Sequence, residues 1–305
     1  MTPNGPDRGE AGAAFADREF PFSRRDFRKI ADIVHAEAGV RLAETKAPLV
    51  YSRLVRRLRA LQMESFARYC ALVESFDGTE ERRQMLGAIT TNVTRFFREP
   101  HHFEHLKSRL LPSVADAVRA GGRLRIWSAG CSSGEEPYSI ALSVLEVMPD
   151  APQLDVRILA TDVNVSVLAR GAAGDYGLEA LQEVSRAQRA KWFDCTRGAD
   201  GRRTLQAGRE LKALVAFRRL NLLSPWPMSA AYQAIFCRNV LIYFDDDDQA
   251  AVQRRMAGLL ATDGRLYLGA AERVRGLETL RPEGQTIYRL QPETSAPAQM
   301  VGTPT

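Results

Sequence analysis

The short apolar run Arg123-Leu-Arg-Ile-Trp-Ser128 is predicted to form a strand that opens into a small-residue loop, Ala129-Gly-Cys-Ser-Ser-Gly134. A helical pattern follows from Pro137 to Met148. Small residues let a ligand approach the backbone closely, and the first N–H groups of a helix have no partner within it. Ligands of open α/β sheets bind beyond the carboxyl ends of the strands. The stretch therefore predicts an α/β sheet with a ligand site at this loop.

The acids Glu135 and Glu136 follow the loop directly. The loop matches neither the dinucleotide-binding pattern nor the phosphate-binding loop, both of which serve anionic ligands. Two acids repel phosphate and suit a cation, so S-adenosylmethionine, with its sulfonium and ammonium groups, fits better. Acids are also common in the first turn of any helix, where they interact favourably with its dipole. The loop alone leaves these two interpretations equal.

A second predicted strand, Val156-Arg-Ile-Leu-Ala-Thr-Asp162, ends in an acid. An acid at such a position can accept hydrogen bonds from both hydroxyls of a ribose, as in dinucleotide folds. The alternative is an N-cap for the following helix. Together, the two motifs indicate a nucleoside ligand without its phosphates.

Strand and helix patterns continue to alternate further along the chain. Ala234–Cys237 and Gly264–Gly269 are predicted strands, with a helix from Asp248 to Leu260 between them. This alternation is typical of a parallel, doubly wound sheet. The segment 175–217 breaks the alternation and contains a hairpin-like turn, so we interpret it as an insertion.

The segment from about Phe22 to Ala88 has a helical pattern throughout and predicts a small all-helical unit. Ser23 is a suitable N-cap for its first helix, and Gly39 a suitable stop. Glycine, alanine, proline and charge dominate the first residues, and we expect disorder there and in the tail. The expected division is a disordered segment 1–19, a helical domain 20–90, a linking motif segment 91–110, an α/β domain 111–290 and a disordered tail 291–305.

The helical unit contains an arginine-rich stretch, Tyr51–Leu61, and we call it the arginine helix. Its leucines fall on one face and its arginines on the other, and no acid is interleaved to pair with them. Segment 21–76 has eleven Lys/Arg and six Asp/Glu, which equals the net charge of +5 of the whole chain. A solvated face, nucleic acid or an acidic protein surface could each explain this charge. The arginines concerned are Arg53, Arg56, Arg57 and Arg59.

The composition predicts a globular protein, with 45% hydrophobic and 26% charged residues. There is no apolar run of membrane-spanning length, and the first twenty residues lack the features of a secretory signal. The four cysteines lie far apart, which argues against a zinc site or a disulfide framework. We therefore expect a cytoplasmic protein without membrane insertion. These cysteines are Cys70, Cys131, Cys195 and Cys237.

Three long motifs resemble the signatures of the bacterial chemotaxis receptor methyltransferases, the CheR family: Thr90–Phe103, Ser128–Ser139 and Phe236–Asp245. The resemblance covers about residues 20–290 in the right order and spacing. It implies an α/β fold, a Rossmann-like class I methyltransferase sheet with a small inserted β-subdomain at 175–217, preceded by a small all-helical N-terminal domain. It also implies a cytoplasmic enzyme, expected to act as a monomer, that uses S-adenosylmethionine to methylate glutamates on chemoreceptors. The products are glutamate methyl ester and S-adenosylhomocysteine.

The resemblance also implies roles for individual residues. Glu135 would contact the methionine end of the cofactor, Asp162 its ribose, and Asn221 and Leu222 the adenine. Arg98 and Tyr243 would be catalytic, although an arginine there is also typical of a surface ion pair and a tyrosine of core packing. The arginine helix would bind the acidic helical bundle of a receptor. The remaining cofactor contacts implied are Asn92, Thr94, Arg98, Arg238 and Asn239.

The chemistry implied by the resemblance requires neither a general base nor a metal. A glutamate carboxylate has a pKa of about 4.3 and is already ionised near neutral pH. His101, His102 and His105 lie at ligand-like spacing at one helix start, but the family motif carries its paired histidine without metal.

Two other functions are compatible with parts of the sequence. A nucleic-acid methyltransferase would use the arginine helix to hold phosphates, yet Cys237-Arg-Asn-Val240 replaces the Asn/Asp-Pro-Pro-Tyr/Phe run that base-amino methyltransferases usually carry. We therefore expect no nucleic-acid partner. A non-catalytic cofactor-binding adaptor is opposed by the presence of Arg98, Asp162 and Tyr243. The inserted β-subdomain docks on receptors in this family, and the sequence leaves open whether it also binds a receptor's C-terminal peptide.

Overall fold

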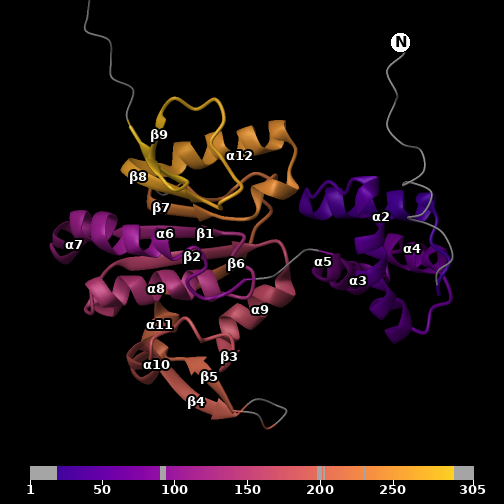
Figure 1. Cartoon of the computed structure of the whole chain (residues 1–305), viewed down its shortest axis with the longest axis horizontal. Helices are drawn as coiled ribbons and strands as arrows, with labels where there is room; N and C mark the ends of the chain where they lie inside the picture. Colours follow the sequence, from indigo (N-terminus) through magenta and orange to yellow (C-terminus); the bar gives the residue numbers. More distant parts are fainter. Residues whose placement is uncertain (1–18, 90–93, 198–200, 202, 230, 292–305) are drawn as a thin grey trace, which may run out of the picture.

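The computed structural model describes residues 19–89, 94–197, 201, 203–229 and 231–291. Most of the two segments for which the sequence predicts disorder, and Asn92, lie outside these residues. Figure 1 shows a helical unit beside a larger α/β unit that carries a small sheet at one end. None of the helices described is both long and apolar enough to cross a membrane.

Over residues 19–89, the helical unit contains four α-helices and a short 3-10 turn, Glu44–Lys46. Their apolar faces form one core, as the 3.6-residue periodicity predicts. Ser23 caps the first helix by accepting a hydrogen bond from the N–H of Asp26, and Gly39 ends it at φ +74°. The helices are α2 (Arg24–Ala38), α3 (Ala47–Ala60), α4 (Phe66–Glu74) and α5 (Thr79–Ile89).

The arginine helix, α3, buries Leu54 and Leu58 completely. No acid lies within the stretch itself, but two acids from outside it pair with its arginines, so its face is less positive than the sequence suggests. Glu81 of α5 pairs with Arg57 at 2.5 Å, and Glu19 pairs with Arg59 at 2.5 Å. Because both acids come from outside the stretch, its local sequence does not reveal them.

The main sheet has seven strands in the order β6-β2-β1-β7-β8-β10-β9. The pairings from β6 to β8 are parallel, and β10 is antiparallel to both its neighbours. The predicted parallel sheet is thus confirmed, with an antiparallel edge that the sequence pattern did not indicate. The strands are β1 (Leu124–Ala129), β2 (Val156–Asp162), β6 (Val215–Arg219), β7 (Tyr232–Cys237), β8 (Leu260–Leu268), β9 (Leu280–Gly284) and β10 (Ile287–Leu290).

Helices cover both faces of this sheet, because its strands bury side chains alternately on the two sides. Leu124 and Ile126 of β1 join the core beneath α7 and α8, whereas Trp127 and Ala129 join the core beneath α12. The strand β1 and its neighbours are therefore apolar on both faces, as parallel strands usually are. The helices are α6 (Pro100–His105), which continues through a π-helical turn, Leu106–Leu110, into α7 (Leu111–Arg119), then α8 (Glu135–Val147), α9 (Val165–Ala173) and α12 (Asp246–Leu259).

The predicted insertion forms a separate antiparallel sheet in the order β3-β5-β4. It lies at the lower end of Figure 1, away from the helical unit. The main sheet resumes at Val215, so the last three residues of the predicted 175–217 insertion belong to β6. The elements are β3 (Asp175–Gly177), α10 (Arg186–Trp192), β4 (Phe193–Arg197), β5 (Arg203–Ala207) and α11 (Arg209–Ala213).

We predict that Glu81→Ala destabilises the protein. The Glu81 carboxylate is nearly buried and accepts hydrogen bonds from Arg57 at 3.0 Å and from the Tyr69 hydroxyl at 2.8 Å. Removing it leaves both donors without this acceptor, at a cost of about 2 kcal/mol in the free energy of unfolding. Urea titration measures this loss. The matched control is Glu80→Ala, which removes an exposed acid from the same helix turn; an equal loss in both variants would contradict the prediction.

Candidate active site

The strand order reverses at β1, which has β2 on one side and β7 on the other. A pocket of about 240 Å³ opens at the carboxyl ends of the strands around this point. Open α/β sheets bind ligands at such a switch point. The α/β residues that line it include Gly130 and Ser132 after β1, Asp162 at the end of β2, Leu220–Leu222 after β6 and Arg238–Phe244 after β7, without Leu241.

The helical unit supplies a second wall of the pocket, which the sequence did not predict. Ala38 ends α2, Val40 and Leu42 follow it, and Ile89 ends α5. Two contacts hold this wall in place. Arg41 forms an ion pair with Asp245 at 2.7 Å, and the Asn221 amide donates to the Glu37 carbonyl at 3.2 Å. The pocket therefore requires both units of the chain.

Asp162 provides a fixed acceptor in the pocket. One carboxylate oxygen accepts the N–H of Ser132 and the other that of Asn164, each at 2.9 Å. Burial raises the pKa of Asp162 above its usual range, and these two N–H groups oppose the rise. Each oxygen keeps a lone pair for a further donor, so the two hydroxyls of a ribose can be accepted side by side.

The backbone conformation of the loop after β1 brings this loop close to the segment that follows β7. Gly130 has φ +78°, and a Cβ on it would lie 2.3 Å from Val240 Cγ2. Gly134, the N-cap immediately before α8, has φ +96°. Both are conformations that glycine adopts without steric cost. The small residues of the loop therefore permit the close packing of two pocket segments.

Glu136, and not the neighbouring Glu135, lines the pocket. Its carboxylate accepts the Ser128 hydroxyl at 2.7 Å and pairs with Arg238 at 3.2 Å. Burial raises the pKa of Glu136, and the charge of Arg238 opposes the rise. The Glu135 carboxylate instead accepts the Ser133 hydroxyl at 2.8 Å. Successive helical residues point about 100° apart, so only one of the two acids faces the ligand.

Arg238 is the central cation of the pocket, with a side chain only 2% exposed. Besides Glu136 it contacts Glu99 at 3.6 Å and donates to the Arg98 carbonyl. Its Nε is buried without a hydrogen-bond partner in the described part of the chain. A buried donor of this kind normally has an acceptor, and a ligand carboxylate would provide one. The neighbouring Glu136 carboxylate could pair with the ammonium group of a ligand that, like an amino acid, carries both groups.

The first motif places Thr94, Arg95 and Arg98 along the pocket. Tyr243 is half-buried and also lines it, and its carbonyl accepts the N–H of Arg41 at 3.4 Å. The structure thus brings together most of the residues that the sequence singled out. Those are Thr94, Arg98, Asp162, Asn221, Leu222, Arg238, Asn239 and Tyr243, while Glu135 lies outside the lining and Asn92 outside the described residues.

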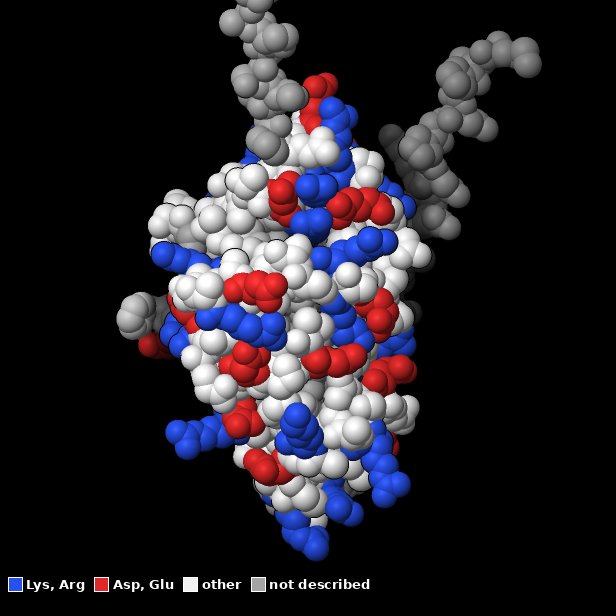
Figure 2. All heavy atoms as spheres, turned by 90° about the vertical axis from the view of Figure 1, so that its left-hand side faces the viewer, with Lys and Arg blue, Asp and Glu red and all other residues white. Residues whose placement is uncertain are grey.

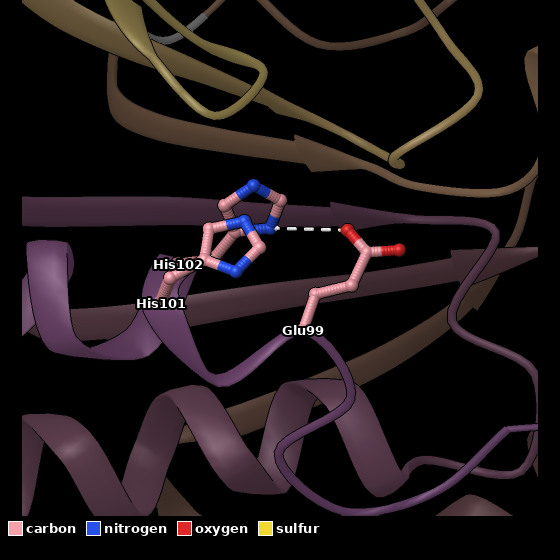
Figure 3. Close-up of side chains that lie close together, drawn as sticks. All are labelled: Glu99, His101 and His102. Atoms are coloured by element: carbon pink, nitrogen blue, oxygen red, sulfur yellow. Dashed lines mark ion pairs between the residues drawn. The ribbon is translucent and has the colours of Figure 1, made fainter.

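Figure 3 shows Glu99 and the two histidines of the motif, whose ligand atoms lie close enough to hold a metal ion. The Glu99 oxygen that faces His102 Nδ1 at 3.6 Å also lies 3.6 Å from the Arg238 guanidinium. That charge opposes a second cation at the same oxygen. His102 Nε2 lies 3.0 Å from the Gln285 carbonyl. We therefore assign the group a structural role, in which it joins α6 to the C-terminal strands.

The sheet order, the switch-point pocket and its acids define a Rossmann-like methyltransferase. Residues 92–287 match the family model described as CheR methyltransferase, SAM binding domain, and residues 25–90 match CheR methyltransferase, all-alpha domain. The chain belongs to the CheR methyltransferase family, and S-adenosylmethionine is its cofactor. Asp162, Glu136 and Arg238 fit this cofactor because they offer acceptors for a ribose and opposite charges for an amino-acid group.

Relatives with assigned names match most of the chain. A probable chemotaxis protein methyltransferase of Rhizobium etli is 49% identical over 244 residues, covering 80% of this chain and 91% of that protein. The chemotaxis protein methyltransferase of Escherichia coli is 40% identical, with 87% and 90% covered. Chemotaxis protein methyltransferase 2 of Pseudomonas aeruginosa is 39% identical, with 90% and 96% covered.

We predict that Asp162→Ala weakens the binding of S-adenosylhomocysteine by about tenfold to a hundredfold, since a hydrogen bond to a charged acceptor contributes about 1.5–3 kcal/mol. Isothermal titration calorimetry measures the dissociation constant. Asp155→Ala is the control, because Asp155 immediately precedes the same strand at its other end and pairs with Arg125. An unchanged affinity in Asp162→Ala would remove this residue from the binding site.

We also predict that His102 makes the fold sensitive to acid. Burial lowers the pKa of His102 from its ordinary value of 6.5 to about 3. The unfolded chain therefore binds this proton first, and stability is lost as the pH falls from 6.5 toward 3. By pH 5 the loss is about 2 kcal/mol.

Urea unfolding at pH 7 and pH 5 tests this, with His102→Gln expected to lose about 2 kcal/mol less than the wild type. His101→Gln, at the adjacent and less buried histidine, serves as the control. Equal acid sensitivity of His102→Gln and the wild type would show that other groups are responsible.

Proposed function

We propose that this methyltransferase transfers a methyl group from S-adenosylmethionine to glutamate side chains in the cytoplasmic helical bundle of bacterial chemoreceptors. The products are a glutamate methyl ester and S-adenosylhomocysteine. The main support is the match to relatives named chemotaxis protein methyltransferases over 80–90% of the chain. The composition of the pocket agrees with it, since a carboxylate nucleophile needs positioning and no base.

Methyl transfer to a carboxylate requires little proton transfer by the protein. A glutamate carboxylate is ionised near neutral pH, and no histidine is among the described residues that line the pocket. When bound, S-adenosylmethionine supplies an electrophilic methyl group, which bonds to a carboxylate oxygen as its bond to sulfur breaks and leaves the electron pair on sulfur. Atoms and charge balance without a base. The task of the site is therefore alignment and exclusion of water.

We assign the alignment to residues on opposite walls of the pocket. Asp162 would accept the ribose hydroxyls, and Leu220–Leu222 would flank the adenine. Glu136 and Arg238 would hold the amino-acid end. Arg98 and Tyr243 would orient the attacking carboxylate, while the apolar wall of the helical unit, Val40 and Leu42 among it, keeps water away.

The arginine helix is our proposed contact with the acidic receptor bundle. Arg53 donates to the carbonyl of Ile89, which lines the pocket, so this helix approaches the site. Arg56 is exposed and has no ion-pair partner in the described parts of the chain. Arg57 and Arg59 pair with Glu81 and Glu19 of the same chain, so they add less to the positive charge of this face than Arg56 does. The inserted β-subdomain is the second expected receptor contact.

The face of the molecule that carries α7 gives no support to a nucleic-acid substrate. Figure 2 shows the side of the molecule that carries α7, where basic and acidic side chains are interspersed over most of the face. Residues of α7 and of the π-helical turn before it form ion pairs, Arg119 with Asp150 and Lys107 with Glu146. A nucleic-acid site requires a continuous basic patch, which this face does not present.

Tritium-labelled cofactor tests the proposal directly. Membranes that carry chemoreceptors should acquire a label that base releases as methanol, as a carboxyl methyl ester does. A receptor whose bundle glutamates are replaced by alanine should stay unlabelled, and the wild-type receptor incubated with Asp162→Ala at limiting cofactor should acquire label about tenfold to a hundredfold more slowly. Label on added RNA alone, with none on receptor protein, would contradict the proposal.

A further inference from the structure

Glu272 lies four residues beyond β8 and is only 4% exposed. Its carboxylate accepts five backbone N–H groups. One oxygen accepts those of Val240 at 2.9 Å, Leu241 at 2.8 Å and Ile242 at 3.4 Å. The other accepts those of Asn239 at 2.9 Å and Gly269 at 2.7 Å. One side chain thus holds four consecutive residues of the chain.

Those four residues form the segment Asn239–Ile242, which we call the β7 loop. The loop connects Arg238 to Tyr243, and Asn239, Val240 and Ile242 line the pocket. Asn239 has φ +59°, in the left-handed region, which asparagine adopts more often than most residues other than glycine. The Glu272 carboxylate accepts the N–H groups of all four loop residues and so holds this conformation.

No lysine or arginine forms an ion pair with Glu272 in the described residues, so peptide dipoles alone compensate its buried charge. A buried carboxylate without such compensation is costly, whereas one with several N–H donors is well stabilised. The backbone of the β7 loop and the carboxylate consequently depend on each other. Neither keeps its position if the other moves.

Gly269 shows how closely the two segments pack. A Cβ on this residue would lie 2.7 Å from Asn239 Nδ2 and 2.8 Å from both Asn239 N and the Glu272 carboxylate. Glu272 also donates its own N–H to the Gly269 carbonyl at 2.9 Å, which closes a tight turn. This turn places the Glu272 carboxylate directly beneath the β7 loop.

We propose that Glu272 is a positioning residue for methyl transfer, which fixes the β7 loop so that Asn239 and Tyr243 occupy their places in the pocket. Glu272 is not among the residues that line the pocket, so it acts through the loop. The catalytic part of this proposal rests on the proposed function. The part that concerns cofactor binding rests on the pocket alone.

Glu272→Gln is the sharpest test, because it keeps the size of the side chain and removes the charge. The glutamine amide presents N–H donors at the position where the carboxylate accepted the N–H groups of Asn239 and Gly269. The matched control is Glu278→Gln, a change of the same kind at an exposed residue of the same segment. Both variants are made in the full chain, and circular dichroism confirms their folding.

Three measurements follow at a temperature well below unfolding. Hydrogen exchange should accelerate at least tenfold in residues 239–242 of Glu272→Gln and stay at the wild-type rate in β7. The dissociation constant for S-adenosylhomocysteine should rise at least tenfold. With receptor as substrate, kcat should fall at least tenfold with little change in the KM for receptor. Glu278→Gln should match the wild type throughout.

The outcomes separate this inference from the proposed function. Wild-type exchange and wild-type cofactor affinity in Glu272→Gln would overturn the inference, whatever the substrate. Equal loss of exchange protection across the whole sheet would overturn it too, since Glu272 would then serve general stability. If the wild type methylates no receptor, the proposed function fails, while exchange and cofactor binding still decide the role of Glu272.

If Glu272→Gln does not fold, Glu272→Asp takes its place. The shorter side chain keeps the charge but cannot span all five N–H groups. It should show the same localised exchange with a smaller loss of affinity. Full wild-type behaviour of the aspartate variant in all three measurements would overturn the requirement for this geometry.

Discussion

The active site depends on the burial of three carboxylates at one edge of the sheet. Each is compensated differently: Asp162 by two backbone N–H groups, Glu272 by five, and Glu136 by a hydroxyl and Arg238. Buried charge is tolerated only with such partners. Arg95, Arg98 and Arg238 also line the pocket. The site therefore sets acids beside arginines, which suits a cofactor whose amino-acid end carries both an ammonium and a carboxylate group.

The same edge explains why the helical unit is required. The strands end in loops that leave the pocket open on one side, and the segment from Ala38 to Leu42 covers that side. Arg41 contacts the loop after β7 through both its backbone and its side chain. A change in the position of the helical unit must therefore alter the pocket. The part of the chain that we expect to meet the receptor is thus mechanically connected to the part that binds the cofactor.

Local signals in the sequence were enough to predict the main helices and strands of the fold. The strand Val156–Asp162 and the limits of α2, set by Ser23 and Gly39, follow from periodicity and capping. Contacts between distant residues were not accessible in this way. The pairing of Arg57 with Glu81 depends on how two helices pack, and the choice of Glu136 over Glu135 depends on the rotation of α8. Glu272 lies about thirty residues from the loop it holds, and no local pattern marks it.

Arg238 gives a physical reason why the three sequence motifs occur together. It belongs to the third motif, pairs with Glu136 of the second, and contacts Glu99 and the Arg98 carbonyl of the first. Its charge lies between two acids, Glu136 and Glu99, that would otherwise repel each other. Loss of any one motif would leave a buried charge without its partner in another. The motifs are thus parts of a single electrostatic unit, and the pocket exists only where all three are folded against each other.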